Sequence, residues 1–136
     1  MKNKIFAILG GTIALFGLGY LIYVVLGLWA LKGPLAEEVF TKLDLLPIII
    51  MEALYAALMT IVFSKWTQIR SFSTGAVAGL LFGVFIGGCT TLEIFATSEL
   101  VGIEGVLMAA VTFGVRFAVA GGIIGLALGN TKGENN

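Results

Sequence analysis

Long runs of apolar residues dominate the chain, and most charged residues fall between the runs rather than inside them. The four runs cover about residues 5–31, 45–64, 73–97 and 105–129. Each is long enough for a helix to cross a hydrocarbon layer about 30 Å thick, which takes roughly 20 residues. None alternates with a period of two, as a strand of a membrane barrel does. The pattern predicts an all-α membrane protein, with one domain over residues 1–136 that forms a four-helix transmembrane bundle.

The composition indicates that lipid surrounds most of the chain. Of the 136 residues, 59% are hydrophobic and 12% are charged, whereas roughly a quarter of the residues in soluble domains are charged. The 8 basic and 8 acidic residues cancel, so no basic excess predicts binding to nucleic acid. Without histidine and with a single cysteine, the chain lacks the ligands of a histidine-bound haem or metal, a Ser-His-Asp triad and an intrachain disulfide. We expect no metal, no cofactor and no enzymatic activity.

Lys and Arg residues are divided unevenly between the two sides that the runs define. The side of the termini holds Lys2, Lys4, Lys65, Arg70 and Lys132, and the other side holds Lys32 and Lys42. Because cytoplasmic flanks carry the excess of Lys and Arg, we predict that both termini are cytoplasmic. The same bias argues against insertion in both orientations.

The connection between the first two runs has a helical pattern of its own. Pro34 suits the first turn of a helix, and apolar residues then recur between charged ones on one face. We predict a short helix over residues 34–43 that lies in the headgroup region as a connector.

Glycine recurs every four residues along the third run. The members of this row, called here the glycine ridge, are Gly75, Gly79, Gly83 and Gly87. Residues four apart share one face of a helix, and small residues let two helix backbones approach closely in lipid. The fourth run carries two rows of small residues, the first with Ala110, Gly114, Ala118 and Gly122 and the second with Gly121, Gly125 and Gly129. These rows predict a tight hairpin of the third and fourth helices, and an oligomer interface is the alternative use of the same surfaces.

Three charged residues lie inside the runs, where a charge costs about 2.5 to 3.5 kcal/mol on insertion scales. With a rise of 1.5 Å per residue, Arg116 lies about 16 Å from the outer end of its helix, Glu52 about 10 Å and Glu93 about 6 Å. Side chains lean toward the N-terminus of their helix, which directs Arg116 and Glu93 toward each other. Glu52 is closer to Arg116 in depth, and Tyr55 lies one turn away from it. The sequence predicts a polar site from these four residues.

The polar site has two interpretations. In the functional one, Glu52 and Glu93 bind a cation, a proton or a small solute, and Arg116 supplies the counter-charge. In the structural one, the charges form a buried salt bridge that determines which helices pair. Both interpretations stay open at this point.

Two segments of the chain resemble a known family. The segment 16–20 (FGLGY) with Tyr23, and the glycine-rich stretch from Gly75 to Gly88, are similar to an uncharacterised family of small four-helix bacterial inner-membrane proteins. The resemblance covers most of the chain by hydropathy and these residues by motif. It implies a multi-pass protein of the bacterial cytoplasmic membrane and brings no assigned activity.

Two functions fit these observations. In the first, which we favour from sequence, the protein is a non-enzymatic interaction or accessory protein that packs through its glycine-rich helices, with lipids, copies of itself or a larger membrane complex as partners. In the second, it is a small transporter or channel module for an ion, a proton or a solute, and uses the intramembrane Glu and Arg residues.

Overall fold

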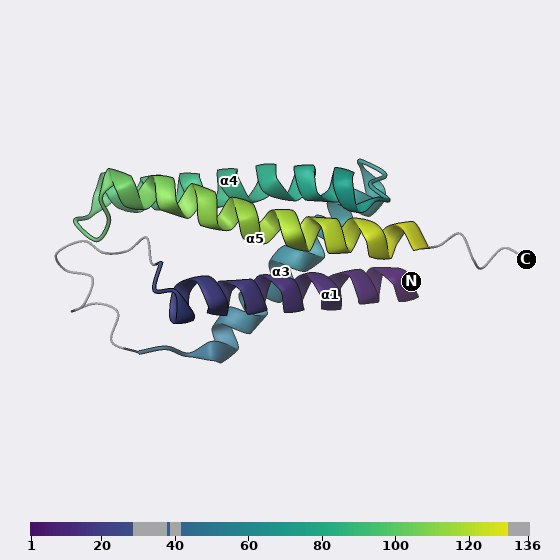
Figure 1. The fold of residues 1–136 in the computed structure, drawn as a ribbon, viewed down its shortest axis with the longest axis horizontal. Helices are drawn as coiled ribbons and strands as arrows, with labels where there is room; N and C mark the ends of the chain where they lie inside the picture. The colour runs from purple at the N-terminus through teal and green to yellow at the C-terminus, as the bar shows by residue number, and fades with distance from the viewer. Residues whose placement is uncertain (29–37, 39–41, 131–136) are drawn as a thin grey trace, which may run out of the picture.

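The computed structural model describes residues 1–28, 38 and 42–130, and its regular elements there are all helical (Figure 1). The elements are α1 (Lys2–Gly19), the π-helix η1 (Tyr20–Val25) that continues it, α3 (Leu45–Lys65), α4 (Phe72–Thr97) and α5 (Ile103–Gly129). Helices α1 and α4 run in one direction, and α5 runs antiparallel to both. We call the end that holds the start of α1 the N-terminal end of the bundle, and the other the opposite end. Helix α3 crosses the bundle obliquely (Figure 1).

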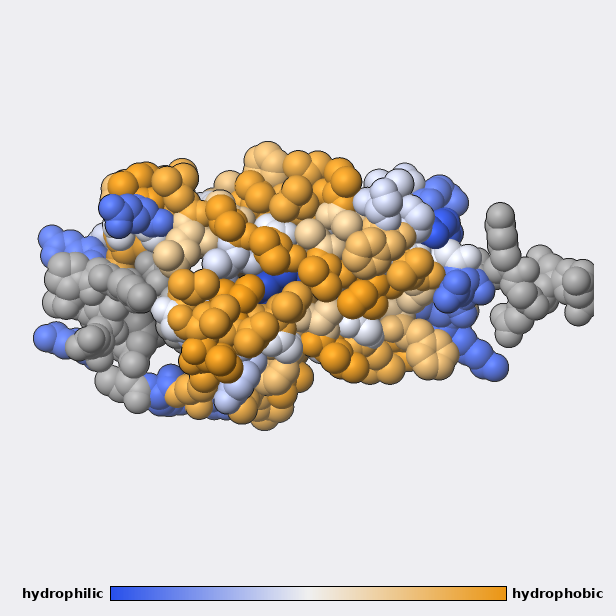
Figure 2. All heavy atoms as spheres, viewed as in Figure 1, coloured by the Kyte–Doolittle hydropathy of each residue, from blue (hydrophilic) through white to orange (hydrophobic). Residues whose placement is uncertain are grey.

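All four helical segments are long and apolar enough to cross a membrane. They contain 24 residues in α1 with η1, 21 in α3, 26 in α4 and 27 in α5. Figure 2 shows hydrophobic atoms over the middle of the molecule and hydrophilic atoms gathered at its two ends. That distribution suits a bundle whose middle lies in hydrocarbon, where helices satisfy their own backbone groups. The prediction of an all-α fold with four helices able to span a membrane is confirmed.

Local polar residues start two of these helices. The carboxylate of Asp44 accepts a hydrogen bond from the Leu46 amide at 3.2 Å, at the start of α3. The hydroxyl of Ser71 accepts one from the Thr74 amide at 3.3 Å, at the start of α4. Such caps satisfy amide groups that have no partner within the helix. The bounds of α3, α4 and α5 accordingly lie within two residues of the predicted runs.

The first span is shorter than predicted. The apolar run suggested a helix to about residue 31, but the helix ends at Val25, and that prediction was wrong. Gly27 adopts a φ of +65°, a left-handed conformation that favours glycine and commonly follows the last helical turn. The apolar residues around it hid this stop. Most of the helix predicted over 34–43 lies outside the described residues; of the three that are described, Glu38 is helical, and Lys42 and Leu43 are not.

Helices α4 and α5 form the most extensive contact of the bundle, and the glycine ridge lies on it. A Cβ atom added to Gly79 would overlap the carbonyl oxygen of Phe117, and one added to Gly83 would overlap that of Phe113. A Cβ added to Gly75 would overlap the carbonyl oxygen of Gly121, and one added to Gly121 would overlap that of Gly75. Side chains at the ridge would therefore push the two backbones apart.

On α5, the first predicted row, which contains Gly114 and Gly122, lies beside this backbone contact and is packed against side chains of α4. A Cβ on Gly114 would lie 3.0 Å from Val84 Cγ2, and one on Gly122 would overlap the ring of Phe72. Ala118 is half-buried. The closest approach of the backbones uses the second predicted row, Gly121, Gly125 and Gly129, which meet carbonyl oxygens of the α3–α4 connection and of α4.

Helix α1 packs on α5 and on α3 through a stripe of small and aliphatic residues. The buried members are Ala7, Gly11, Leu15 and Gly19. Gly11 sits against Ile124 of α5 and Ala56 of α3. The best-buried large side chains of the core, Met59, Phe63, Phe117 and Ile124, lie from the middle of the bundle toward the N-terminal end. Toward the opposite end the helices leave a cavity whose lining includes Tyr23 and Thr91.

We expect Gly79→Ala to destabilise the protein by about 1–3 kcal/mol or more, because the added methyl group meets a carbonyl oxygen that belongs to the backbone of α5. The matched control is Gly88→Ala on the same helix, where the nearest atom would be 3.7 Å away. That control should change stability by no more than about 1 kcal/mol, in the stabilising direction. Thermal unfolding in detergent micelles measures both. Equal losses in the two variants would contradict the close contact.

Candidate functional site

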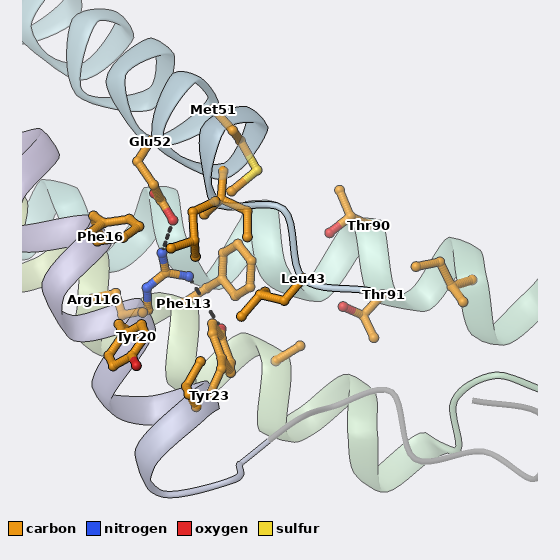
Figure 3. A pocket seen from close by; sticks show the side chains of 16 residues that line it. Phe16, Tyr20, Tyr23, Leu43, Met51, Glu52, Thr90, Thr91, Phe113 and Arg116 are labelled. Atoms are coloured by element: carbon orange, nitrogen blue, oxygen red, sulfur yellow. Dashed lines mark hydrogen bonds and ion pairs between the residues drawn. The ribbon is translucent and has the colours of Figure 1, made fainter. Parts of the chain in front are cut away.

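A buried ion pair between α5 and α3 forms the centre of the candidate site. The Nη2 atom of Arg116 donates to the Oε1 atom of Glu52, and each side chain is only 2% exposed. Figure 3 shows the Glu52 carboxylate pointing at the guanidinium. Arg116 is 13 residues from the start of α5, about 20 Å along the helix. The pair therefore lies near the middle of the span.

Helix α1 and its continuation complete the surroundings of Arg116. Nη2 also donates to the carbonyl oxygen of Leu15 at 3.1 Å, and Nη1 donates to the hydroxyl of Tyr23 at 3.4 Å. The carbon atom Cζ lies 5.2 Å from the centroid of the Tyr23 ring and 5.1 Å from that of Phe113. A guanidinium is attracted to ring faces and to oxygen acceptors. One carboxylate, one carbonyl, one hydroxyl and two rings thus hold the cation.

The backbone of α1 is shaped for this contact. Gly19 lies so close that an added Cβ would be 2.9 Å from Nη2 of Arg116. The π-helix η1 begins at the next residue, and single π-turns commonly mark functional positions in helices. Tyr23 lies within η1, and its hydroxyl is also 3.3 Å from the hydroxyl of Thr112 on α5. Gly19 and Tyr23, one turn apart, therefore both lie against the buried cation.

Two atoms of the pair have no hydrogen-bond partner among the described residues. They are Oε2 of Glu52, an acceptor, and Nε of Arg116, a donor. Both are buried, and a buried polar atom without a partner is costly. The pair is therefore held firmly through Oε1 and the two terminal guanidinium nitrogens, yet retains unused hydrogen-bonding capacity.

The structure brings together two of the four residues predicted for the site. Glu93 is exposed on α4 and takes no part in the pair, so the predicted contact with Arg116 is absent. Buried Thr91 marks the inner face of α4, and Glu93, two residues later, is turned about 200° from it. Tyr55 is half-buried, and its ring packs edge-on against Phe117 with centroids 5.2 Å apart. It supports the helix contact next to the pair.

Sequence reasoning missed the contributions of α1. Gly19 and Tyr23 lie four residues apart in an apolar run without charges. A glycine one helical turn before a tyrosine is the sequence signal that could have indicated them. No side-chain pattern predicts that the backbone carbonyl of Leu15 accepts from Arg116. That contact depends on how deeply the guanidinium reaches across the bundle.

A cavity of about 300 Å³ lies between the four spans, with the ion pair in its wall. Its lining includes Phe16, Tyr20 and Tyr23 from the first span, Ile48 and Met51 from α3, Thr90 and Thr91 from α4, and Phe113 from α5. Figure 3 shows these side chains converging from separate helices. Aliphatic and aromatic groups make up most of the lining. Because α3 crosses the bundle obliquely, the start of α3 lies apart from the end of α4 (Figure 1). The cavity thus combines a mostly apolar lining with one polar group, the ion pair, and this combination is typical of ligand sites.

Within the described part of the chain, no group of three or more His, Cys, Asp and Glu residues is placed to hold a metal ion. No protein-family model, curated protein or solved structure matches the chain. We therefore infer function from the geometry of the chain's own residues.

We expect Gly19→Ala to lower stability by about 1–3 kcal/mol, because its methyl group would displace the buried guanidinium from Glu52 and Leu15. Gly17→Ala is the matched control two residues earlier, since an added Cβ there meets nothing within 4 Å. The control should be neutral or stabilising by up to about 1 kcal/mol. Thermal unfolding of both variants in micelles checks this. If both variants unfold at the wild-type temperature, the position of Arg116 does not depend on the absence of a side chain at Gly19.

Proposed function

We propose that the protein is a non-enzymatic, multi-pass membrane protein that binds a small amphipathic organic solute within the bilayer, as the binding module of a transport process. The observation that carries this proposal is the cavity of about 300 Å³ with the Glu52–Arg116 pair in its wall. Its volume lies at the lower end of the range of about 300–1,000 Å³ that ligand pockets occupy. The depth of the pair supports access to molecules that dissolve in lipid.

The lining favours an organic solute over a bare ion. A site for a small cation concentrates oxygen ligands around the ion, whereas aromatic and aliphatic groups form most of this wall. The charge of Glu52 is already balanced by Arg116, so no unpaired negative charge remains to attract a cation. The apolar wall instead suits the hydrocarbon part of an amphipathic molecule.

The accessory role expected from the glycine-rich helices has less support. The glycine ridge lies against the backbone of α5, so this surface is already used within the chain. A partner protein or a second copy would have to bind other faces of the bundle.

We place the protein in the bacterial cytoplasmic membrane with both termini inside. Lys2, Lys4, Lys65 and Arg70 lie at the N-terminal end of the bundle, and this excess supports a cytoplasmic position for that end. The cavity then lies between the opposite, outer end and the middle of the membrane.

This orientation predicts the behaviour of reporter fusions. Green fluorescent protein fused after residue 136 should fluoresce, and alkaline phosphatase fused at the same position should be inactive, because both stay in the cytoplasm. The matched control moves the two reporters to the connection after Ser98, where the results should reverse. Phosphatase activity at the C-terminus would contradict the orientation.

Binding in the cavity is tested by filling it. Ile48 lines the cavity, and its neighbour Ile49 is 40% exposed and does not. The probes are four trifluoromethyl-labelled dodecyl compounds in lipid nanodiscs: an alcohol, its methyl ether, a carboxylate and a trimethylammonium. We expect ¹⁹F NMR to show a saturable bound signal for at least one probe. Ile48→Trp should weaken that binding at least about tenfold, through lost space worth 1.4 kcal/mol or more, and Ile49→Trp should leave it unchanged. No saturable signal from any probe, or equal effects of the two variants, would contradict the proposal.

A further inference from the structure

The charge balance of the cavity bears on the kind of solute that fits it. Glu52 and Arg116 are the only charged side chains among the described residues that line it, and they pair one to one. A charged solute would add an uncompensated charge near the middle of the membrane, where isolated charges are strongly disfavoured. An uncharged solute leaves the balance intact.

Arg116 already uses three of its five N–H donors within the chain. Its Nη2 atom donates to Glu52 and to the Leu15 carbonyl, and its Nη1 atom donates to Tyr23. Its Cζ atom lies over the rings of Tyr23 and Phe113, 5.2 and 5.1 Å from their centroids. The nitrogen without a partner, Nε, lies on the side of Gly19, where an added Cβ would be 3.3 Å away. An anionic solute would therefore compete with Glu52 for a cation whose charge is already balanced.

Glu52, in contrast, has a carboxylate oxygen that accepts no hydrogen bond from the described residues. The structure gives its carboxylate one partner, Arg116, which binds Oε1, and Oε2 is buried without a partner among the described residues. Glu52 lines the cavity, and Oε2 is the oxygen of its carboxylate that Arg116 leaves unused. An oxygen of this kind accepts a hydrogen bond and has none to donate.

We propose that the solute is an uncharged amphiphile with a hydroxyl group, of the class of long-chain alcohols and acylglycerols, and that this hydroxyl donates to Oε2 of Glu52. Its hydrocarbon chain lies along Phe16, Tyr20 and Ile48. This assignment rests on the proposed function and names the solute class for the same cavity. The ion pair stays intact in the complex, and the unpartnered oxygen gains its missing hydrogen bond.

The relative affinities of the four dodecyl probes in nanodiscs test the assignment. The alcohol should bind at least about tenfold more tightly than its methyl ether, which has the same chain and lacks the donor, because a hydrogen bond to a charged acceptor is strong. The alcohol should also bind more tightly than the carboxylate and the trimethylammonium probes. Equal affinities of alcohol and ether, or tightest binding of a charged probe, would overturn the assignment. If one of these probes binds in the wild-type protein and its binding is lost in Ile48→Trp, the proposed function survives even when the hydroxyl assignment fails. If no probe binds saturably, the proposed function and the assignment both fail.

A charge variant tests the same reasoning independently. Glu52→Gln leaves the cation of Arg116 without its counter-charge, so the carboxylate probe should become the tightest binder of the four. Glu93→Gln makes the same chemical change on the exposed face of α4 and should leave the wild-type order of affinities unchanged. An unchanged order in folded Glu52→Gln, or a changed order in Glu93→Gln, would contradict control by the Glu52 charge. Should Glu52→Gln fail to fold, the alcohol and ether comparison in the wild-type protein still decides.

Discussion

The burial of Arg116 near the middle of α5, a helix long and apolar enough to cross a membrane, is the constraint on which much of this structure depends. A guanidinium does not lose its proton in proteins, so the surrounding helices must compensate its charge. They do so from three directions, with Glu52 on α3, the Leu15 carbonyl on α1, and Tyr23 on η1. The contact requires α1, α3 and α5 to meet at one depth. The charge thus selects the arrangement of three helices whose other residues are mostly apolar.

The fourth helix is held by a different interaction. The glycine ridge of α4 lies against the backbone of α5, and such close packing associates helices in lipid without polar groups. The bundle therefore combines a tight, apolar hairpin with a second side organised by an ion pair. The core fills the N-terminal half, and the oblique path of α3 leaves the cavity in the other half. The ion pair lies in the wall of this cavity, and each of its side chains is only 2% exposed.

Local patterns in the sequence predicted much of this arrangement, and the remainder depends on relations between helices. The lengths of the apolar runs predicted four spans, and glycine spacing predicted the α4–α5 hairpin. The rarity of charge in the runs identified Glu52 and Arg116. Depth alone could not decide between Glu52 and Glu93 as the partner of Arg116, because the choice depends on the rotation of α4 and the crossing of α3. The stop at Gly27 was hidden by its apolar neighbours, and neither the π-helix nor the cavity has a periodic signal.

A double-mutant cycle on Glu52 and Arg116 tests the central claim most directly. The unfolding free energies of wild type, Glu52→Leu, Arg116→Met and the double variant are measured in the same micelles. Either single substitution leaves one buried charge unpaired and should cost about 3–5 kcal/mol, whereas the double variant should recover most of that loss. Losses that simply add in the double variant would show that the two residues do not depend on each other, and would contradict an arrangement organised by their ion pair.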